Sequence, residues 1–408
     1  MPHRRAMLIF HSQCQRGHAP TREFHNGDWT DFAECPERVD AMLAALGPTA
    51  EPDDHGLDAI LAVHDADYVE FLRTAHEDWV AAGRTGDAIG YAFPVVRRVK
   101  RSHERIDARL GMFGFDASTP IAAGTWDATY QSAQCALSAV AAIERGDVRQ
   151  AFALSRPPGH HAGSDYRGGY CYLNAAAIAA RAAQARGLGR VSILDVDYHH
   201  GNGTQDIFYE DGDIFFASIH ADPSTDYPFF WGHADERGSG SGKGATLNLP
   251  LPRGTGWDAY APALDRAIAA IEDRGTEMLV VSYGADTFID DPISFFALTT
   301  DDMRRIGARI AATQLPVVAV MEGGYAIEAL GRNVAAFIDG LEAKWDSTTR
   351  TFSEGDEHAL HIAAGRFGSA KRRAFIPTTS CALPCGRARD PLRASSPHLH
   401  RFASWTGN

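Results

Sequence analysis

The chain has 408 residues, of which 45% are hydrophobic and 22% are charged, a composition typical of a globular protein. It contains no run of about 18–20 apolar residues, so we expect neither a membrane span nor a membrane partner. The net charge of −13 is uneven, because residues 345–408 carry nine Lys and Arg against five Asp and Glu, which leaves −17 on the first 344 residues. Such an acidic body disfavours nucleic acid and attracts cationic molecules, although solubility alone would also explain it.

Apolar runs alternate with Ala-rich helical patterns along most of the chain. We expect strands at Met7–Phe10, Ala151–Leu154, Val191–Val196, Ile214–Ile219, Thr246–Leu251, Met278–Ser282 and Pro316–Met321. We expect helices at Tyr130–Arg145, Asn174–Arg186, Trp257–Arg274, Asp301–Thr313 and Glu328–Glu342. This alternation predicts an α/β fold with a central, mostly parallel sheet flanked by helices on both faces.

Two segments do not fit this pattern. Residues 80–125 are rich in Gly, Arg and aromatic residues and are interpreted as a long insertion or loop. Residues 344–408 are dominated by Ser, Thr, Pro and Arg without periodicity, so we predict a disordered tail after a domain spanning 1–343.

The start of the chain and its cysteines indicate the compartment. The apolar run Met7–Phe10 lacks a small-residue cleavage site, so we interpret it as a strand and not a signal peptide. Without a secretion signal, we expect free thiols in a reducing cytoplasm at all six cysteines, Cys14, Cys35, Cys135, Cys171, Cys381 and Cys385.

Polar stretches follow directly after five of the predicted strands: Arg156–His161, Asp195–Asn202, Ser218–His220, Gly284–Asp286 and Glu322–Tyr325. Ligands of open α/β sheets bind outside the carboxyl ends of the strands. We therefore expect these stretches to form one composite site at that edge of the sheet.

The stretch after Val191–Val196 indicates a metal site. In an extended backbone Asp195, Asp197 and His199 point to one face, and three ionisable groups beside an apolar run are costly without a partner. Mixed Asp and His ligands suit Zn²⁺, and Asp286 is a candidate third ligand, although it could instead cap a helix. Two carboxylates would leave the zinc nearly neutral, so a nearby general base would be valuable.

Two further motifs supply polar groups for such chemistry. The turn Arg156-Pro-Pro-Gly-His160-His161 presents adjacent histidines, which could be bases or metal ligands depending on their partners; Asp195 and Asn202 are available. Glu322-Gly-Gly-Tyr325 offers a phenol that could stabilise an oxyanion, or a ring that merely packs in a tight turn.

These four motifs, in this order, resemble the signature set of the zinc-dependent histone deacetylase superfamily, and the similarity runs from residue 7 to about 343. Residues 168–171, 206–210, 229–232 and 291–296 resemble more closely the bacterial acetylpolyamine amidohydrolases. The resemblance implies a single arginase/deacetylase-like domain and a cytoplasmic hydrolase that deacetylates small cationic amines such as N-acetylputrescine, N-acetylcadaverine or acetylspermidine. It also implies a homodimer, in which the 80–125 insertion narrows the substrate channel.

The same resemblance implies a role for each motif residue. Asp197, His199 and Asp286 would bind one catalytic Zn²⁺. His161, paired with Asn202, would be general base and then acid, whereas His160, paired with Asp195, would act mainly as an electrostatic stabiliser. Tyr325 would hydrogen-bond the amide oxygen.

Structural K⁺ and substrate positions are also implied. One K⁺ would be held by the Asp195 carboxylate, the Ser218 side chain and the backbone of Asp197, His199 and Ile219. A second would use backbone carbonyls near Phe208, Asp211 and Ile214. Substrate would contact Gly169, Tyr170, Glu23, Phe230 and Asp116.

The sequence departs from the acetylpolyamine amidohydrolase pattern at the channel mouth. Ser118 stands where a second acidic residue is expected, with Asp116 nearby. Three alternatives therefore stay open: a protein or peptide acetyl-lysine deacetylase, a binuclear Mn²⁺ ureohydrolase of arginase type, and a catalytically silent binding protein on the same fold.

Overall fold

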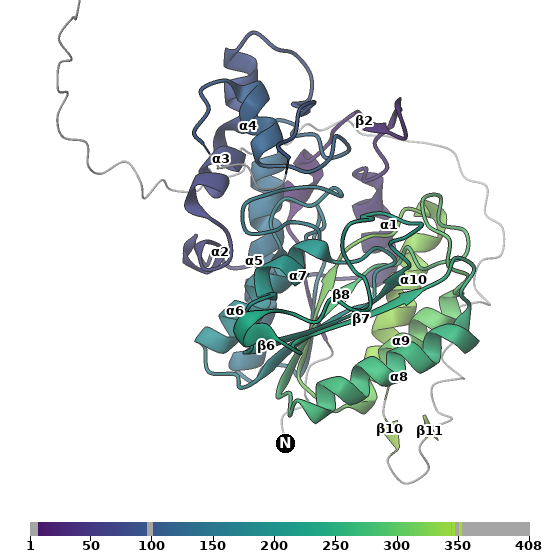
Figure 1. Ribbon diagram of the computed structural model, residues 1–408. Helices are drawn as coiled ribbons and strands as arrows, with labels where there is room; N and C mark the ends of the chain where they lie inside the picture. The colour runs from purple at the N-terminus through teal and green to yellow at the C-terminus, as the bar shows by residue number, and fades with distance from the viewer. Residues whose placement is uncertain (1–6, 96–100, 344, 347–350, 353–408) are drawn as a thin grey trace, which may run out of the picture. The chain divides into compact units, whose positions relative to one another are not determined.

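The computed structural model describes residues 7–95, 101–343, 345–346 and 351–352. Contacts divide the chain into a large unit, Met1–Ala359, and a small one, Leu360–Asn408, which lies outside the described residues. The following description therefore concerns the large unit (Figure 1).

A seven-stranded sheet forms the centre of this unit. Its order is β1 (Leu8–Phe10), β4 (Gln150–Ala153), β9 (Val317–Met321), β8 (Met278–Tyr283), β5 (Val191–Asp195), β6 (Ile214–Ala221) and β7 (Thr246–Leu251). Every neighbouring pair is parallel. All seven predicted strands are confirmed, and the sheet is wholly parallel where we expected a mostly parallel one.

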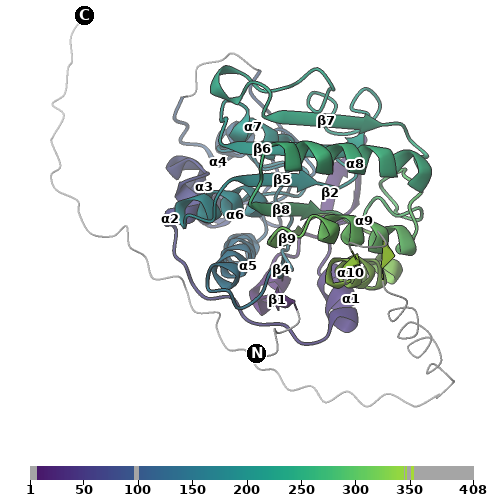
Figure 2. The ribbon, with the colours of Figure 1, turned by 90° about the horizontal axis from the view of Figure 1, so that it is seen from below.

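Helices cover both faces of the sheet, as Figure 2 shows, with α5 and α6 on one side and α1, α8, α9 and α10 on the other. Alternate residues of each strand enter the two cores. In β9, Val318 and Val320 belong to the core under α5 and α6, whereas Val317 and Ala319 belong to the opposite core. Burial on both faces explains why these strands are continuous apolar runs in the sequence.

The helices are α1 (Glu37–Leu46), α2 (Asp58–Leu61), α3 (Ala66–Ala81), α4 (Ile106–Met112), α5 (Thr125–Glu144), α6 (Ala175–Ala185), α7 (Asn202–Phe208), α8 (Trp257–Asp273), α9 (Thr300–Ala312) and α10 (Ile327–Glu342). Short 3₁₀ turns lie at Gln13–Gly17 and Gly240–Gly242. The five predicted helices correspond to α5, α6, α8, α9 and α10. The sequence analysis missed the shorter helices and the hairpin of β2 (Arg22–His25) and β3 (Asp28–Asp31).

The two irregular segments are only partly described. The 80–125 segment contains α4, whose Ile106 and Leu110 are buried one turn apart, and residues 96–100 lie outside the described residues. Within 344–408, where we expected no regular structure, β10 (Trp345–Asp346) and β11 (Thr351–Phe352) pair antiparallel. The rest of the predicted tail lies outside the described residues.

Cys35, Cys135 and Cys171 are free thiols. Cys14 is disulfide-bonded, so the expectation of a free thiol is wrong there. Cys381 and Cys385 lie outside the described residues. No helix among the described residues is long and apolar enough to cross a bilayer.

Candidate active site

Five adjacent strands, β4, β9, β8, β5 and β6, place their carboxyl ends together, and the five polar stretches follow these strands. They surround a pocket of about 650 Å³ whose lining includes His161, His199, Tyr170, Tyr227 and Tyr325. The composite site expected from the strand ends is therefore present in the structure.

Asp197, His199 and Asp286 lie together at the base of this site. Their ligand atoms are all within 4.8 Å of one another. His199 Nδ1 lies 3.0 Å from Asp286 Oδ2 and 3.5 Å from Asp197 Oδ1. Asp197 and Asp286 are fully buried, and His199 faces the pocket.

The expectation that Asp195 shares a face with Asp197 and His199 is wrong. β5 ends at Asp195, so the side-chain alternation of a strand does not continue to His199. The Asp195 carboxylate instead accepts a hydrogen bond from His160 Nδ1 at 3.0 Å, and its other oxygen accepts the Asp197 N–H at 3.1 Å.

The Asp–His–Asp group fits a divalent cation. Asp197 Oδ2 accepts the Gly323 N–H at 2.9 Å, and Asp286 Oδ1 accepts the Tyr198 N–H at 3.0 Å, so the backbone orients both carboxylates. A Cβ at Gly284 would lie 2.0 Å from Asp197 Oδ2, so only glycine leaves room for that carboxylate. Buried carboxylates without a cationic partner are costly, and a metal ion satisfies both at once.

The charge of the group also appears in His199. Burial lowers the pKa of this imidazole, but the hydrogen bonds and charges of Asp197 and Asp286 outweigh it and raise the pKa to about 10. Among the described residues a second cluster, His160, Cys171 and Glu322, also has metal-ligand atoms close together. None of its members lines the pocket, and His160 is already paired with Asp195, so we assign the metal to the first group.

The two adjacent histidines have different partners. His161 Nδ1 donates to Asn202 Oδ1 at 2.7 Å, whereas His160 is bonded to the Asp195 carboxylate. The turn that carries them is held by Glu322, whose Oε2 accepts the Gly159 and His160 N–H groups at 2.7 and 3.1 Å.

These partners give the two imidazoles opposite charge states. Burial lowers the pKa of His160, but the charges of Asp197 and Asp195 outweigh it and raise the pKa to about 10. Burial, and then the charges of His160 and His199, hold the pKa of His161 well below its usual value. At neutral pH His160 is therefore a cation and His161 a neutral imidazole that can accept a proton.

Tyr325 reaches the same pocket from the turn after β9. Its backbone N–H donates to Asp291 Oδ2 at 2.7 Å. The Arg38 guanidinium lies 5.0 Å from its ring centroid and donates to the carbonyls of Gly324 at 2.7 Å and Glu322 at 2.6 Å. The sequence analysis missed Arg38 and Asp291: Asp291 lies in the 291–296 stretch already noted, whereas no motif indicates Arg38.

Comparison with known proteins identifies the family. The model of the histone deacetylase domain matches residues 32–341. The chain belongs to the histone deacetylase family. It is 48% identical to acetylpolyamine amidohydrolase 1 of Pseudomonas aeruginosa over 82% of this chain and 99% of that protein. It is 44% identical to the acetylpolyamine amidohydrolase of Mycoplana ramosa, with the same two coverages.

A solved structure of the same kind agrees with the fold. The crystal structure of acetylpolyamine aminohydrolase from Burkholderia pseudomallei matches with a TM-score of 0.77 and 42% identity, over 82% of this chain and 98% of that one. The HDA15 HD domain matches with a TM-score of 0.68 and 25% identity, over 82% of this chain and 91% of that one. The arginase/deacetylase-like architecture of this histone deacetylase family member therefore extends to solved relatives.

The residues expected to contact substrate in this histone deacetylase family member lie at different depths. Gly169, Tyr170 and Asp116 line the pocket. Asp116 Oδ2 accepts the Gly169 N–H at 2.6 Å and the Tyr227 hydroxyl at 2.9 Å, so it joins two walls. Tyr227 was not anticipated from the sequence.

Glu23 and Phe230 lie outside the pocket lining. Glu23 is 3% exposed, and its Oε1 accepts the Tyr170 hydroxyl at 2.9 Å, behind the wall. Phe230 is 79% exposed, and its neighbour Phe229 lines the pocket instead.

The segments expected to hold K⁺ are also close in space. Asp195 and Ser218 are direct neighbours across β5 and β6, and the Ser218 hydroxyl is bonded to His220 Nδ1 at 2.8 Å. Ile219 continues β6. For the second ion, the Phe208 carbonyl accepts the Asp211 N–H at 3.0 Å, and Ile214 begins β6.

Proposed function

We propose that this protein is a metal-dependent acetylpolyamine amidohydrolase, which hydrolyses N-acetylputrescine, N-acetylcadaverine or acetylspermidine to the polyamine and acetate. The observation that carries the proposal is one pocket at which a metal-ligand group, a neutral histidine and a tyrosine converge. The 43–48% identity to four acetylpolyamine amidohydrolases supports the substrate class.

The proposed catalytic metal is one Zn²⁺ per chain, held by Asp197, His199 and Asp286, because mixed Asp and His ligands in a buried group suit zinc. When bound, it would supply Lewis-acid polarisation of the amide and a water of lowered pKa. We also propose structural K⁺ at the two sites named above. The three free thiols favour a cytoplasmic location.

In the proposed reaction His161 accepts a proton from the attacking water, whose oxygen adds to the acetyl carbon. The Tyr325 hydroxyl donates to the amide oxygen as negative charge develops there. His160, cationic and fixed by Asp195, stabilises that charge. His161 then returns the proton to the leaving nitrogen as the C–N bond breaks, which releases the amine and acetate.

The pocket walls suit a slender cationic chain. Tyr170, Tyr227, Phe229 and Phe295 line the pocket and offer aromatic faces to a methylene chain and its ammonium group. The lining carboxylates Asp116 and Asp226 already accept hydrogen bonds from Tyr227 and Arg253 respectively, so they contribute mainly long-range charge. Ser118 lines the pocket where an acidic residue was expected.

A substrate panel tests this function. Zinc-loaded protein is assayed with N-acetylputrescine and with an acetyl-lysine peptide, and its metal content is measured by elemental analysis. We expect kcat/KM to favour N-acetylputrescine and one zinc per chain. A clear preference for the peptide would establish the protein deacetylase alternative, and two Mn²⁺ per chain would establish the ureohydrolase alternative.

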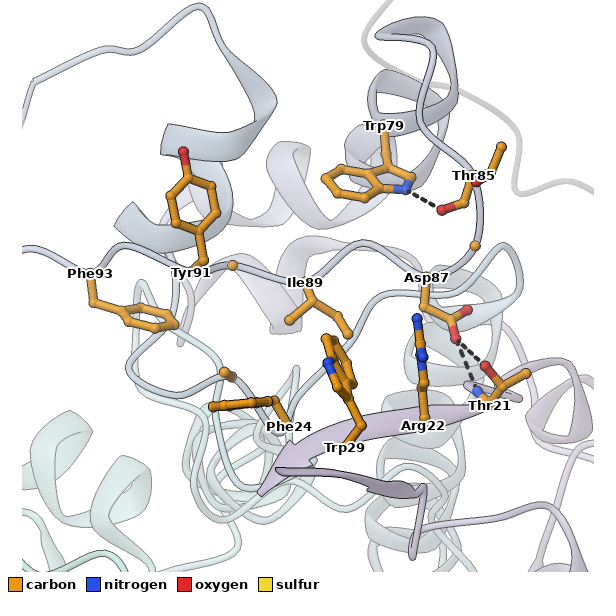
Figure 3. Close-up of a pocket in the computed structure, with 13 residues that line it drawn as sticks. Thr21, Arg22, Phe24, Trp29, Trp79, Thr85, Asp87, Ile89, Tyr91 and Phe93 are labelled. Atoms are coloured by element: carbon orange, nitrogen blue, oxygen red, sulfur yellow. Dashed lines mark hydrogen bonds between the residues drawn. The ribbon is translucent and has the colours of Figure 1, made fainter. Parts of the chain in front are cut away.

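We further propose a homodimer formed through the hairpin β2–β3 and the 80–95 segment. These enclose a second pocket of about 740 Å³, in which Phe24, Trp29, Ile89, Tyr91 and Phe93 gather (Figure 3). Trp29 is 47% and Tyr91 75% exposed, an apolar surface of the kind that marks protein interfaces. This pocket shares Phe24 and Ala117 with the active-site pocket, so a second subunit there would border the substrate entrance.

A further inference from the structure

Behind the general base a chain of hydrogen bonds leads away from the pocket. His161 Nδ1 is bonded to Asn202 Oδ1 at 2.7 Å. The Asn202 amide nitrogen donates to the Tyr166 hydroxyl at 3.4 Å, and that hydroxyl donates to Asp206 Oδ2 at 2.5 Å. Asn202 and Asp206 lie one turn apart on α7, and Tyr166 bridges them from the loop after the His160-His161 turn.

The order of donors in this chain follows from its far end. Loss of hydration raises the pKa of Asp206 to about 6, so above neutral pH its carboxylate only accepts. Burial, and then the charge of Asp206, raise the pKa of Tyr166 well above its usual value, so the phenol keeps its proton. Because that single proton is given to Asp206, the phenol oxygen can only accept from Asn202.

The Asn202 amide is thereby oriented. Its NH₂ group must face Tyr166, which turns its carbonyl oxygen toward His161. A carbonyl oxygen accepts but cannot donate, so the proton of neutral His161 must reside on Nδ1 and the lone pair on Nε2. An amide in the opposite orientation would instead favour the other tautomer, with Nε2 blocked by its own proton.

The Tyr166 ring is held in place for this task. A Cβ at Gly163 would lie 2.3 Å from Tyr166 Cε1, so glycine is needed for the ring to fit. The Phe115 ring packs edge-on against it at a centroid distance of 5.6 Å. Its hydroxyl position is thus determined by packing and not only by its two hydrogen bonds.

We propose that Tyr166 and Asp206 are positioning residues that select the basic Nε2 tautomer of His161 by orienting the Asn202 amide. The proposal rests on the function of His161 as general base. It predicts that a carboxylate at position 202, which has no donor end to orient, makes Tyr166 dispensable.

The test compares Tyr166→Phe, Asn202→Asp and the double variant in the full-length, zinc-loaded protein with N-acetylputrescine. Tyr166→Phe should lower kcat about 10–100-fold, the usual cost of losing an outer hydrogen-bond partner, with little change in KM. In the Asn202→Asp background the same substitution should change kcat less than about twofold, because the two sites are then uncoupled.

The matched control is Tyr130→Phe. Its hydroxyl also donates to a carboxylate, Asp54, at 2.5 Å, but it lies on α5 away from the pocket, so kcat should be unchanged. Should Tyr166→Phe fold poorly, Asp206→Leu on α7 removes the same acceptor, and Asp206→Asn retains one. The first should lose kcat and the second should keep most of it.

A second readout does not depend on activity. In ¹⁵N-histidine NMR spectra of the metal-free protein, His161, assigned by its loss in His161→Ala, should show the Nδ1–H tautomer, and Tyr166→Phe should show both tautomers. An unchanged tautomer, or an equal loss of kcat in both backgrounds, would overturn the proposal. An inactive wild-type protein with the expected tautomers would instead contradict the proposed function alone.

Discussion

At the scale of single residues, Tyr325 separates chemistry from metal binding. Its hydroxyl is proposed to donate to the developing oxyanion, and it is not one of the three proposed zinc ligands. Tyr325→Phe should lower kcat about 10²-fold or more while the zinc content stays at one per chain. Steady-state kinetics and elemental analysis check this, and near-normal turnover would remove Tyr325 from the reaction.

Glu23 gives the protein a pH-dependent stability. Burial raises the pKa of this carboxyl to about 8, above the value of about 4.3 in an unfolded chain. Between these values the folded protein holds one more proton than the unfolded chain, so the contribution of Glu23 to stability decreases as the pH rises through this window. Glutamine does not titrate and avoids this loss.

The melting temperature of Glu23→Gln relative to wild type should therefore increase from pH 5 to pH 9. Glu328→Gln, at an exposed position in the first turn of α10, is the control and should keep a constant difference from wild type. Parallel pH profiles of Glu23→Gln and wild type would show that Glu23 is ionised in the folded protein throughout.

At the scale of elements, the packing of α9 on α10 depends on one glycine. A Cβ at Gly307 would lie 2.2 Å from the Phe337 carbonyl oxygen and 2.9 Å from the Leu341 nitrogen, both backbone atoms. The two helices would have to separate, so Gly307→Ala should lower the free energy of unfolding by about 1–3 kcal/mol.

Thermal unfolding checks this prediction, with Gly17→Ala as control, because a Cβ there meets its nearest atom at an ordinary 3.7 Å. The kcat of the folded Gly307→Ala protein should be unchanged, since this interface lies away from the pocket lining. Equal melting temperatures of the two variants would mean that α9 and α10 adjust without cost.

At the scale of the whole molecule, the proposed dimer makes a prediction about association. Tyr91→Arg places a charge in the exposed aromatic surface of Figure 3 and should convert the dimer to monomer in size-exclusion chromatography with light scattering. Leu61→Arg, at another exposed apolar position on α2, should leave the dimer intact. A wild-type monomer would refute the dimer.

The sequence by itself determined the strands of the sheet and the edge at which the site forms. Each buried strand is a short apolar run, and the polar residues follow it directly, so local pattern alone indicates both. Asp197, His199, Asp286, His161 and Tyr325 were identified in this way, and the structure brings them to one pocket.

Only the tertiary structure decided which partner each polar group takes. Asp195 bonds to His160, 35 positions earlier, Glu23 is buried behind Tyr170, and Tyr166 bridges Asn202 and Asp206. Arg38 supports the turn of Tyr325 from 286 residues away. Hydrogen bonds between residues distant in the chain leave no periodic trace in the sequence, because they depend on where separate loops meet in space.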